Sequence, residues 1–204
     1  MDEAQVSLRE RTRRAVRGEI AEAAMGLFLE KGFDSTTVEE IAQAAGISRR
    51  SYFRYFTGKD EALAGALEAI GRAIAEELAQ RPAGEAPWAC LRHAFAPLLA
   101  RAEADPRAAA LARLMLERPD LQRGKEASWQ EGIAQALAHR LPQGTTEPAF
   151  VSRALAGAAI CCLHSAQDQW LRPGEDRPLS ALLDTAMDAV HPLRPGERRA
   201  KPAE

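Results

Sequence analysis

The sequence has few of the residues that favour β-strands. Its 204 residues include only 12 valines and isoleucines together, whereas alanine and leucine, which both favour helices, number 42 and 22. The three cysteines, Cys90, Cys161 and Cys162, are too few for a disulfide framework and indicate a reduced, cytoplasmic setting. This composition predicts an all-α protein without structural disulfides.

Long apolar segments and a large excess of one charge are also missing. No apolar run approaches the roughly 20 residues that a membrane-spanning helix needs, and residues 1–17 lack the apolar core of a signal peptide. We therefore expect neither a membrane association nor export. The net charge of −2 predicts no general affinity for nucleic acid, so any DNA binding must depend on local charge.

Positive charge is concentrated near the start of the chain. Five arginines fall within nine residues, with a single acidic residue among them. They are Arg9, Arg11, Arg13, Arg14 and Arg17. Such a block is usually the solvated start of a helix. It can also hold a phosphate backbone by charge alone, without reading sequence.

Apolar spacing and capping residues predict helices in the first half of the chain. A helix begins near Leu8 and ends at Lys31-Gly32, which supplies a basic last turn and a C-cap. Thr37 and Glu40 are spaced as a capping box that opens a short second helix. Gly46 ends that helix, because the sharp reversal needs a left-handed residue.

A third and a fourth helix follow directly. Ser48 is placed to cap a short helix over residues 49–56. Thr57 and Asp60 are spaced as a second capping box, which opens a long helix to about Gln80.

Two short helices separated by Ala45-Gly46-Ile47-Ser48 are typical of a helix-turn-helix, whose second helix enters the DNA major groove. The glycine alone is weak evidence, because any helical hairpin can contain one. The second helix, however, carries two arginines and a serine in its first turn. Four aromatic residues interleaved with another arginine follow, and they are half of all phenylalanines and tyrosines in the chain. This combination favours a DNA-binding surface.

The same segment resembles the DNA-binding domain of TetR-family transcriptional regulators over about residues 10–65. The resemblance rests on the motif Thr36-Thr37-Val38-x-x-Ile41-Ala42-x-x-Ala45-Gly46-Ile47-Ser48-x-x-Ser51-x-x-x-Tyr55-Phe56-x-x-Lys59-Asp60-x-x-Leu63. It implies an all-α fold of about nine helices: a three-helix DNA-binding domain over residues 1–58 and a larger effector-binding and dimerisation domain over residues 59–192. The Pro-, Arg- and Glu-rich residues 193–204 are predicted to be a disordered tail.

The resemblance also implies roles for individual residues. Thr36, Tyr55 and Lys59 match phosphate-contacting positions, whereas Tyr52 and Phe56 match core positions. Base edges would be met by Arg49, Arg50 and Ser51, and Phe53 stands where the family usually has a DNA-touching tyrosine. The full predicted DNA-binding set is Arg13, Thr36, Thr37, Ser48, Arg49, Arg50, Ser51, Phe53, Arg54, Tyr55 and Lys59.

Helical periodicity continues to the end of the chain, with a kink expected at Pro97 inside a helix over residues 88–102. The resemblance implies a ligand pocket between these helices, for a hydrophobic or aromatic effector with few polar anchors. The predicted lining is Trp88, Phe95, Leu99, Met115, Trp129, Ile133, Leu137, Cys161 and His164, and ordinary core packing is the alternative for each. Candidate polar anchors are His93, His164 and Asp168.

The last two predicted helices, over residues 147–171 and 178–190, carry broad apolar faces rich in small residues. Such faces suggest association, and in the family the corresponding helices form a four-helix dimer interface. We predict a homodimer through Val151, Leu155, Ala158, Cys162, Leu182, Ala186 and Met187. The alternative is that these residues belong to the core.

The sequence contains few of the residue patterns that are typical of enzymes. A di-iron bundle needs two Glu-x-x-His motifs, and the chain has only one Asp188-x-x-His191. Cys161-Cys162 lacks further zinc ligands, and no glycine-rich phosphate loop is present. We therefore predict a regulator that needs no metal or cofactor and represses from a palindromic operator until a small effector releases it. The alternative is a helical ligand-binding or scaffold protein without a regulatory role.

Overall fold

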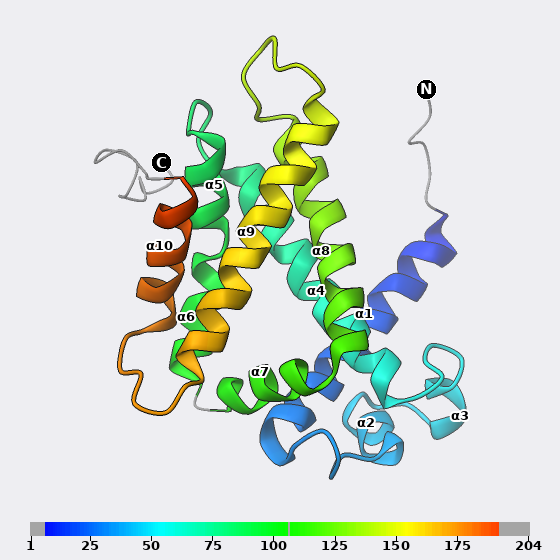
Figure 1. Cartoon of the computed structure of the whole chain (residues 1–204). Helices are drawn as coiled ribbons and strands as arrows, with labels where there is room; N and C mark the ends of the chain where they lie inside the picture. Colours follow the sequence, from blue (N-terminus) through cyan, green and yellow to red (C-terminus); the bar gives the residue numbers. More distant parts are fainter. Residues whose placement is uncertain (1–6, 106, 192–204) are drawn as a thin grey trace. The chain divides into compact units, whose positions relative to one another are not determined.

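The structure is a computed structural model that describes residues 7–105 and 107–191. All regular secondary structure in these residues is helical, which confirms the predicted all-α class (Figure 1). The ten helices are α1 (Leu8–Lys31), α2 (Val38–Ala44), α3 (Arg49–Tyr52), α4 (Lys59–Gln80), α5 (Pro87–Ala94), α6 (Ala96–Ala104), α7 (Ala108–Glu117), α8 (Pro119–Ala138), α9 (Pro148–Trp170) and α10 (Leu179–Val190). The predicted tail, residues 193–204, lies outside the described residues.

The described residues contain one helix more than the nine predicted, because the helix expected over residues 88–102 is divided. α5 ends at Ala94, Phe95 is the cap residue between the two segments, and α6 begins at Ala96. Pro97 stands in the first turn of α6. A proline there has no N–H to continue the hydrogen-bond ladder, whereas it fits well at the start of a helix.

The chain forms two compact units that divide between Ala69 and Ile70, inside α4. The domain boundary that we predict from the sequence lies earlier, between residues 58 and 59. In the first unit, α2 packs against both α1 and α3. Its core is apolar and contains Ile20, Ala24, Phe28, Ile41, Tyr52, Phe56 and Leu63.

The second unit is a helical bundle in which α9 packs against α8 and α10 (Figure 1). Its core draws on α5, α6, α8, α9 and α10, together with the later turns of α4. Gly71 of α4 and Trp129 of α8 approach so closely that a Cβ on residue 71 would lie 2.4 Å from the indole Cδ1. Only glycine fits between this turn of α4 and the indole.

The helix α9 is the one described helix whose length and mean hydropathy would allow it to span a membrane. Only 39% of its most apolar window is buried inside the protein. The helix nevertheless carries Arg153 and His164 and packs between two neighbours in the bundle. Some apolar residues of α9 therefore remain exposed on the surface of the protomer.

Candidate nucleic-acid interface

The turn between α2 and α3 is built as its sequence predicts. The Thr37 hydroxyl accepts from the Glu40 amide, and the Glu40 carboxylate accepts from the Thr37 amide at 2.8 Å, so the capping box is confirmed. Gly46 has a φ of +67°, the left-handed conformation predicted for it. Ser48 caps α3 by accepting from the Ser51 amide at 3.1 Å. These local bonds fix the entry of α3.

The helix α3 is shorter than predicted. It ends at Tyr52 rather than near Phe56, and residues 53–55 form turns. The Arg54 and Tyr55 amides donate to carbonyls three residues back, which tightens the backbone. Tyr52 and Phe56 are fully buried, and the core positions predicted for them are confirmed. These two buried rings fix residues 53–55 to the core of the first unit.

Side chains that carry positive charge or an aromatic ring remain on the outer side of this segment. Arg49, Arg50 and Arg54 are exposed, and Phe53 is 47% exposed. The Arg49 guanidinium lies 5.5 Å from the centre of the Phe53 ring and forms an ion pair with Glu39 at 2.9 Å. An exposed aromatic ring between arginines can pack on a thymine methyl while its neighbours hydrogen-bond to bases or phosphates.

A hollow beside this segment is lined by the start of α1. Its lining includes Arg9, Thr12 and Arg13 from α1 together with Arg54 and Tyr55 from the turn after α3. Three arginines therefore face one open hollow, which can accept a phosphate oxygen. The structure thus brings the predicted Arg13, Arg54 and Tyr55 together.

Arg17, which the sequence groups with the exposed arginines, is used inside the first unit. Its guanidinium donates to the Tyr55 carbonyl at 2.6 Å, pairs with Glu61 at 3.0 Å and lies 4.3 Å from the Phe56 ring centre. These partners lie some 40 residues away in the sequence, and no local pattern marks them. Arg17 therefore helps to position residues 55–56 through their inward-facing atoms.

Two of the predicted phosphate-binding residues also face inward. Thr36 is 1% exposed, and its hydroxyl donates to the Gly32 carbonyl at 2.8 Å. The Lys59 ammonium donates to the carbonyls of Phe33 at 2.9 Å and Asp34 at 3.2 Å, and lies 4.5 Å from the Phe33 ring centre. We therefore leave Thr36 and Lys59 out of the proposed DNA-contacting surface.

Replacing Lys59 with alanine should destabilise the first unit rather than alter the salt dependence of DNA binding. The variant leaves the carbonyls at the end of α1 without their charged donor, and we expect a loss of about 1–3 kcal/mol in the free energy of unfolding. Urea denaturation followed by circular dichroism measures this loss. A variant of unchanged stability whose DNA affinity depends less steeply on salt would instead make Lys59 a phosphate contact.

In the second unit, most of the predicted pocket lining belongs to one apolar cluster. Trp88, Phe95, Leu99, Trp129, Ile133 and Leu137 are all buried in it. Met115 is buried as well, whereas Cys161 is exposed on α9. Of the candidate polar anchors, His93 is buried against Glu85 at 2.6 Å, and the exposed Asp168 pairs with Arg172.

His164 differs from the other two polar candidates because one of its nitrogens has no protein partner. Nδ1 lies 3.2 Å from a Glu126 oxygen, but Nε2 is buried without a hydrogen bond. Among the predicted pocket residues, His164 is therefore the one that offers a free polar atom to a ligand.

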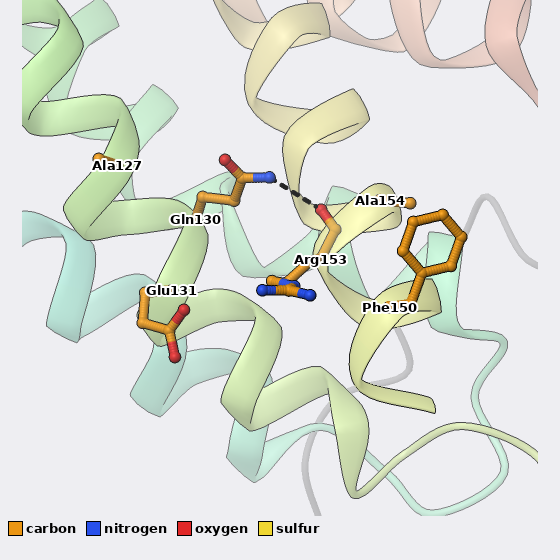
Figure 2. A pocket seen from close by; sticks show the side chains of 6 residues that line it. All are labelled: Ala127, Gln130, Glu131, Phe150, Arg153 and Ala154. Carbon is orange, nitrogen blue, oxygen red and sulfur yellow. Dashed lines mark hydrogen bonds between the residues drawn. The ribbon is translucent and has the colours of Figure 1, made fainter. Parts of the chain in front are cut away.

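A different hollow lies on the outer side of α8 and α9 (Figure 2). Gln130 of α8 points toward α9, and its amide donates to the Arg153 carbonyl at 3.1 Å. Phe150 stands at the edge of the hollow and is 61% exposed. None of the nine predicted pocket residues lines this hollow.

The residues predicted for a dimer interface divide into two groups. Cys162, Leu182 and Met187 are buried within the core of one protomer, which removes them from a surface that a partner could reach. Val151, Leu155, Ala158 and Ala186 are half-buried. The fully exposed side of α9 carries Phe150, Ala154 and Cys161, which follow one another at helical spacing.

No group of three or more histidine, cysteine, aspartate or glutamate side chains in residues 7–105 and 107–191 is arranged to hold a metal ion.

Two family models match the chain. The model of bacterial regulatory proteins of the tetR family matches residues 20–66, and the model of the MftR C-terminal domain matches residues 85–195. The first match lies in the first compact unit and the second match in the second.

Relatives with names agree with these models. MftR of Mycobacterium tuberculosis, whose name associates it with regulating mycofactocin biosynthesis, is 32% identical over 184 residues, covering 84% of this chain and 87% of that protein. The transcriptional regulator TcmR of Streptomyces glaucescens is 39% identical over 94 residues. That second alignment covers 46% of this chain and 42% of TcmR.

Solved structures share the whole fold. The repressor FadR of Thermus thermophilus, solved in complex with lauroyl-CoA, is 25% identical, with a TM-score of 0.58 over 92% of this chain and 98% of that one. A TetR regulator from Rhodococcus sp. RHA1 has a TM-score of 0.61 over 89% of this chain and 97% of that one. At 17% identity, this second likeness concerns the fold alone.

Proposed function

Because the chain belongs to the tetR family of bacterial regulatory proteins, we propose that it represses transcription by binding an inverted-repeat operator as a homodimer and leaves it when a small effector binds. It is a DNA-binding transcriptional regulator rather than an enzyme. The observation that carries the finer proposal is the exposed surface of α3 and the turn after it. There arginines and Phe53 stand outward above the buried Tyr52 and Phe56.

The role that we propose for each side chain is based on its contacts in the structure. Arg50 is exposed and has no ion-pair partner among the described residues, so its guanidinium is available to form two hydrogen bonds with a guanine. Phe53 cannot donate a hydrogen bond and would pack on a thymine methyl. Arg13 and Arg54, which line the basic hollow, would hold phosphates and set the position of the protein on the duplex.

Replacing Arg50 with alanine should relax specificity at one base pair of each half-site. The loss of a bidentate contact should weaken binding to the preferred sequence by about 1–3 kcal/mol and leave binding to random DNA nearly unchanged. Fluorescence anisotropy with the operator and with operators substituted at single positions measures both effects. An equal loss on every sequence would make Arg50 a phosphate contact.

Arg101→Ala is the matched control for this variant. Arg101 is exposed on α6 in the second unit and has the same charge as Arg50. Its removal should leave both affinity and specificity within experimental error.

Our proposals for the effector and for the dimer are based on the second unit. FadR, the solved relative described above, holds lauroyl-CoA, and the large apolar cluster of the present chain suits a hydrophobic or aromatic effector. We place the partner subunit on α9 and α10, where Phe150, Leu155, Ala158 and Ala186 leave apolar surface partly exposed. We propose a cytoplasmic protein that associates with DNA and not with a membrane.

The proposed mechanism is a shift between two populations of the dimer. One would hold the two α3 helices about 34–36 Å apart, one turn of DNA. An effector that binds the other population more tightly shifts the dimer toward it and so lowers the affinity for DNA. The shift is limited by the ratio of the effector's affinities for the two populations. α4 runs without interruption from Lys59 to Gln80 and has residues in both compact units, which makes it our candidate for carrying the change.

The proposed function is tested directly by selection from random duplex DNA at a salt concentration of about 0.15 M. The repressor should enrich an inverted repeat. Binding that appears only at low salt and enriches no sequence, with and without candidate effectors, would favour a helical ligand-binding protein that does not regulate genes.

A further inference from the structure

An unusual group of polar and aromatic side chains lies on α8 and the neighbouring α9. Gln122, Lys125 and Trp129 follow one another at three- and four-residue spacing, so they share one face of α8. His164 extends from α9, which packs along α8 (Figure 1). We call these four residues, together with Glu126, the α8–α9 polar cluster.

Lys125 is the most unusual member of the cluster. Its side chain is only 7% exposed, although lysine is almost never buried without a carboxylate to pair with. Among the residues that the structure describes, no hydrogen bond or ion pair holds its ammonium group, which lies 5.1 Å from the centre of the Trp129 ring. Burial lowers the pKa of Lys125 to about 8, against the charge of the neighbouring Glu126.

His164 provides a complementary group. Burial, followed by the positive charge of Lys125, lowers the pKa of His164 to about 4, so the imidazole is neutral at pH 7. Nδ1 lies 3.2 Å from Glu126 Oε1, and this negative charge favours the neutral tautomer with its proton on Nδ1. Nε2 is then a buried acceptor without a donor.

Gln122 leaves a second acceptor unsatisfied, because its Oε1 is buried without a partner. Leaving such atoms unpaired costs stability, and buried polar atoms without a partner are rare in native proteins. The cluster therefore presents one cationic donor, Lys125 Nζ, and two acceptors, His164 Nε2 and Gln122 Oε1. Lys125 is close enough to His164 for its charge to act on the imidazole, so a group that both accepts and donates suits this pair.

From these contacts we infer that the α8–α9 polar cluster binds the hydroxyl group of a phenol whose remaining surface is apolar, because a carboxylate, ionised at pH 7, could not donate to His164. The hydroxyl donates to His164 Nε2, and its oxygen accepts from Lys125 Nζ. The indole of Trp129 borders the apolar part of the molecule. This inference rests on the proposed effector-binding function and gives the effector a chemical class.

Three probes with one skeleton separate the hydroxyl from the apolar body: 2-naphthol, 2-naphthoic acid and 2-methylnaphthalene. Calorimetry with the full-length protein should give 2-naphthol about 10-fold or more tighter binding than 2-methylnaphthalene. 2-Naphthoate cannot donate to His164 Nε2 and should bind less tightly than 2-naphthol, so the reverse order overturns the inference. Equal binding of all three probes, or no binding of any, overturns the inference.

Lys125→Met and His164→Phe test the site itself. Each variant should remove most of the preference for the hydroxyl-bearing probe while keeping the weaker binding of 2-methylnaphthalene. Methionine keeps an unbranched chain without the charge, so we expect that variant to fold, and its thermal unfolding checks this. A preference that survives in both variants places the probe elsewhere and overturns the inference.

Lys31→Met is the matched control, because Lys31 pairs with Glu40 in the other compact unit. Its probe binding should equal that of the unchanged protein. The selection of operator DNA is measured separately and needs no probe. Failure of the probes with a recovered operator therefore rejects only the effector class, whereas failure of the selection rejects the proposed function.

Discussion

Replacing Phe56 with alanine should lower the free energy of unfolding of the first compact unit by about 3–5 kcal/mol, the usual cost of removing a buried phenylalanine side chain. Phe56 is 1% exposed. Its ring lies 5.7 Å from that of Tyr52 and 4.3 Å from the Arg17 guanidinium carbon. One side chain thus links α3 to α1.

The loss should reach DNA binding as well, because Phe56 follows directly on the turn that presents Phe53 and Arg54. Domains typically have about 5–15 kcal/mol of stability, so a loss of this size removes a large share of it and loosens the segment that carries Phe53 and Arg54. Urea denaturation followed by circular dichroism should show the destabilisation, and operator binding by anisotropy should weaken in parallel.

Phe150→Ala provides the matched control. Phe150 is 61% exposed, so the same change of side chain there removes little buried surface from the protomer. Its free energy of unfolding in dilute, monomeric protein should change by less than about 0.5 kcal/mol. Equal losses in the two variants would contradict the assignment of Phe56 to the core.

Replacing Glu85 with alanine should be similarly costly, at about 3–5 kcal/mol, because the change strands a buried cation. Arg81 donates to both Glu85 oxygens, at 2.8 and 2.9 Å, and His93 Nδ1 lies 2.6 Å from one of them. Cys90 contributes a further contact at 3.3 Å. The side chains of Arg81, Glu85 and His93 are 11%, 15% and 8% exposed, so water cannot replace the lost carboxylate.

This cluster also gives the protein a defined acid sensitivity. Burial opposes the charged form of Glu85, but hydrogen bonds from Arg81, His93 and Cys90 outweigh it and lower the pKa of the carboxyl to about 2. A carboxyl whose pKa is lower in the folded state stabilises the fold above its unfolded pKa of about 4.5 and loses that contribution as the pH falls toward 2.

The measurement is the difference in urea stability between the unchanged protein and Glu85→Ala at several pH values. The difference should be largest above pH 5 and shrink steadily below about pH 4.5. Glu76→Ala, at an exposed position of α4, is the control and should show little effect at any pH. A difference that stays constant down to the lowest pH would mean that the charge of Glu85 contributes nothing.

Local features of the fold could be predicted because short stretches of sequence specify them. Thr37 with Glu40, Ser48 and Gly46 each act within four residues, and the structure has the caps and the left-handed turn that they predict. The exception among caps is Thr57, whose amide donates to Glu61 at 2.7 Å and not to Asp60. One residue of offset in a helix start is below what such spacing resolves.

The fate of individual charged side chains could not be predicted, because it depends on distant partners. Arg17 and Lys59 carry the same kind of charge as Arg13 and Arg50, yet they donate to backbone carbonyls 38 and 26 residues away. Lys125 is buried with no pattern in α8 to mark it. Which arginines and lysines remain free to meet DNA or a ligand is thus decided by tertiary packing.

The ion pair between Arg49 and Glu39 has a consequence for how the protein searches a genome. Both side chains are well exposed, so the pair is weak and open to exchange. In the proposed complex, a phosphate of random DNA would have to displace Glu39, so little affinity would be gained from Arg49. On an operator where Arg49 meets a base, as we propose, the exchange would be favourable. Glu39 would then act as an internal competitor that shortens residence on wrong sites and increases the contrast with the operator.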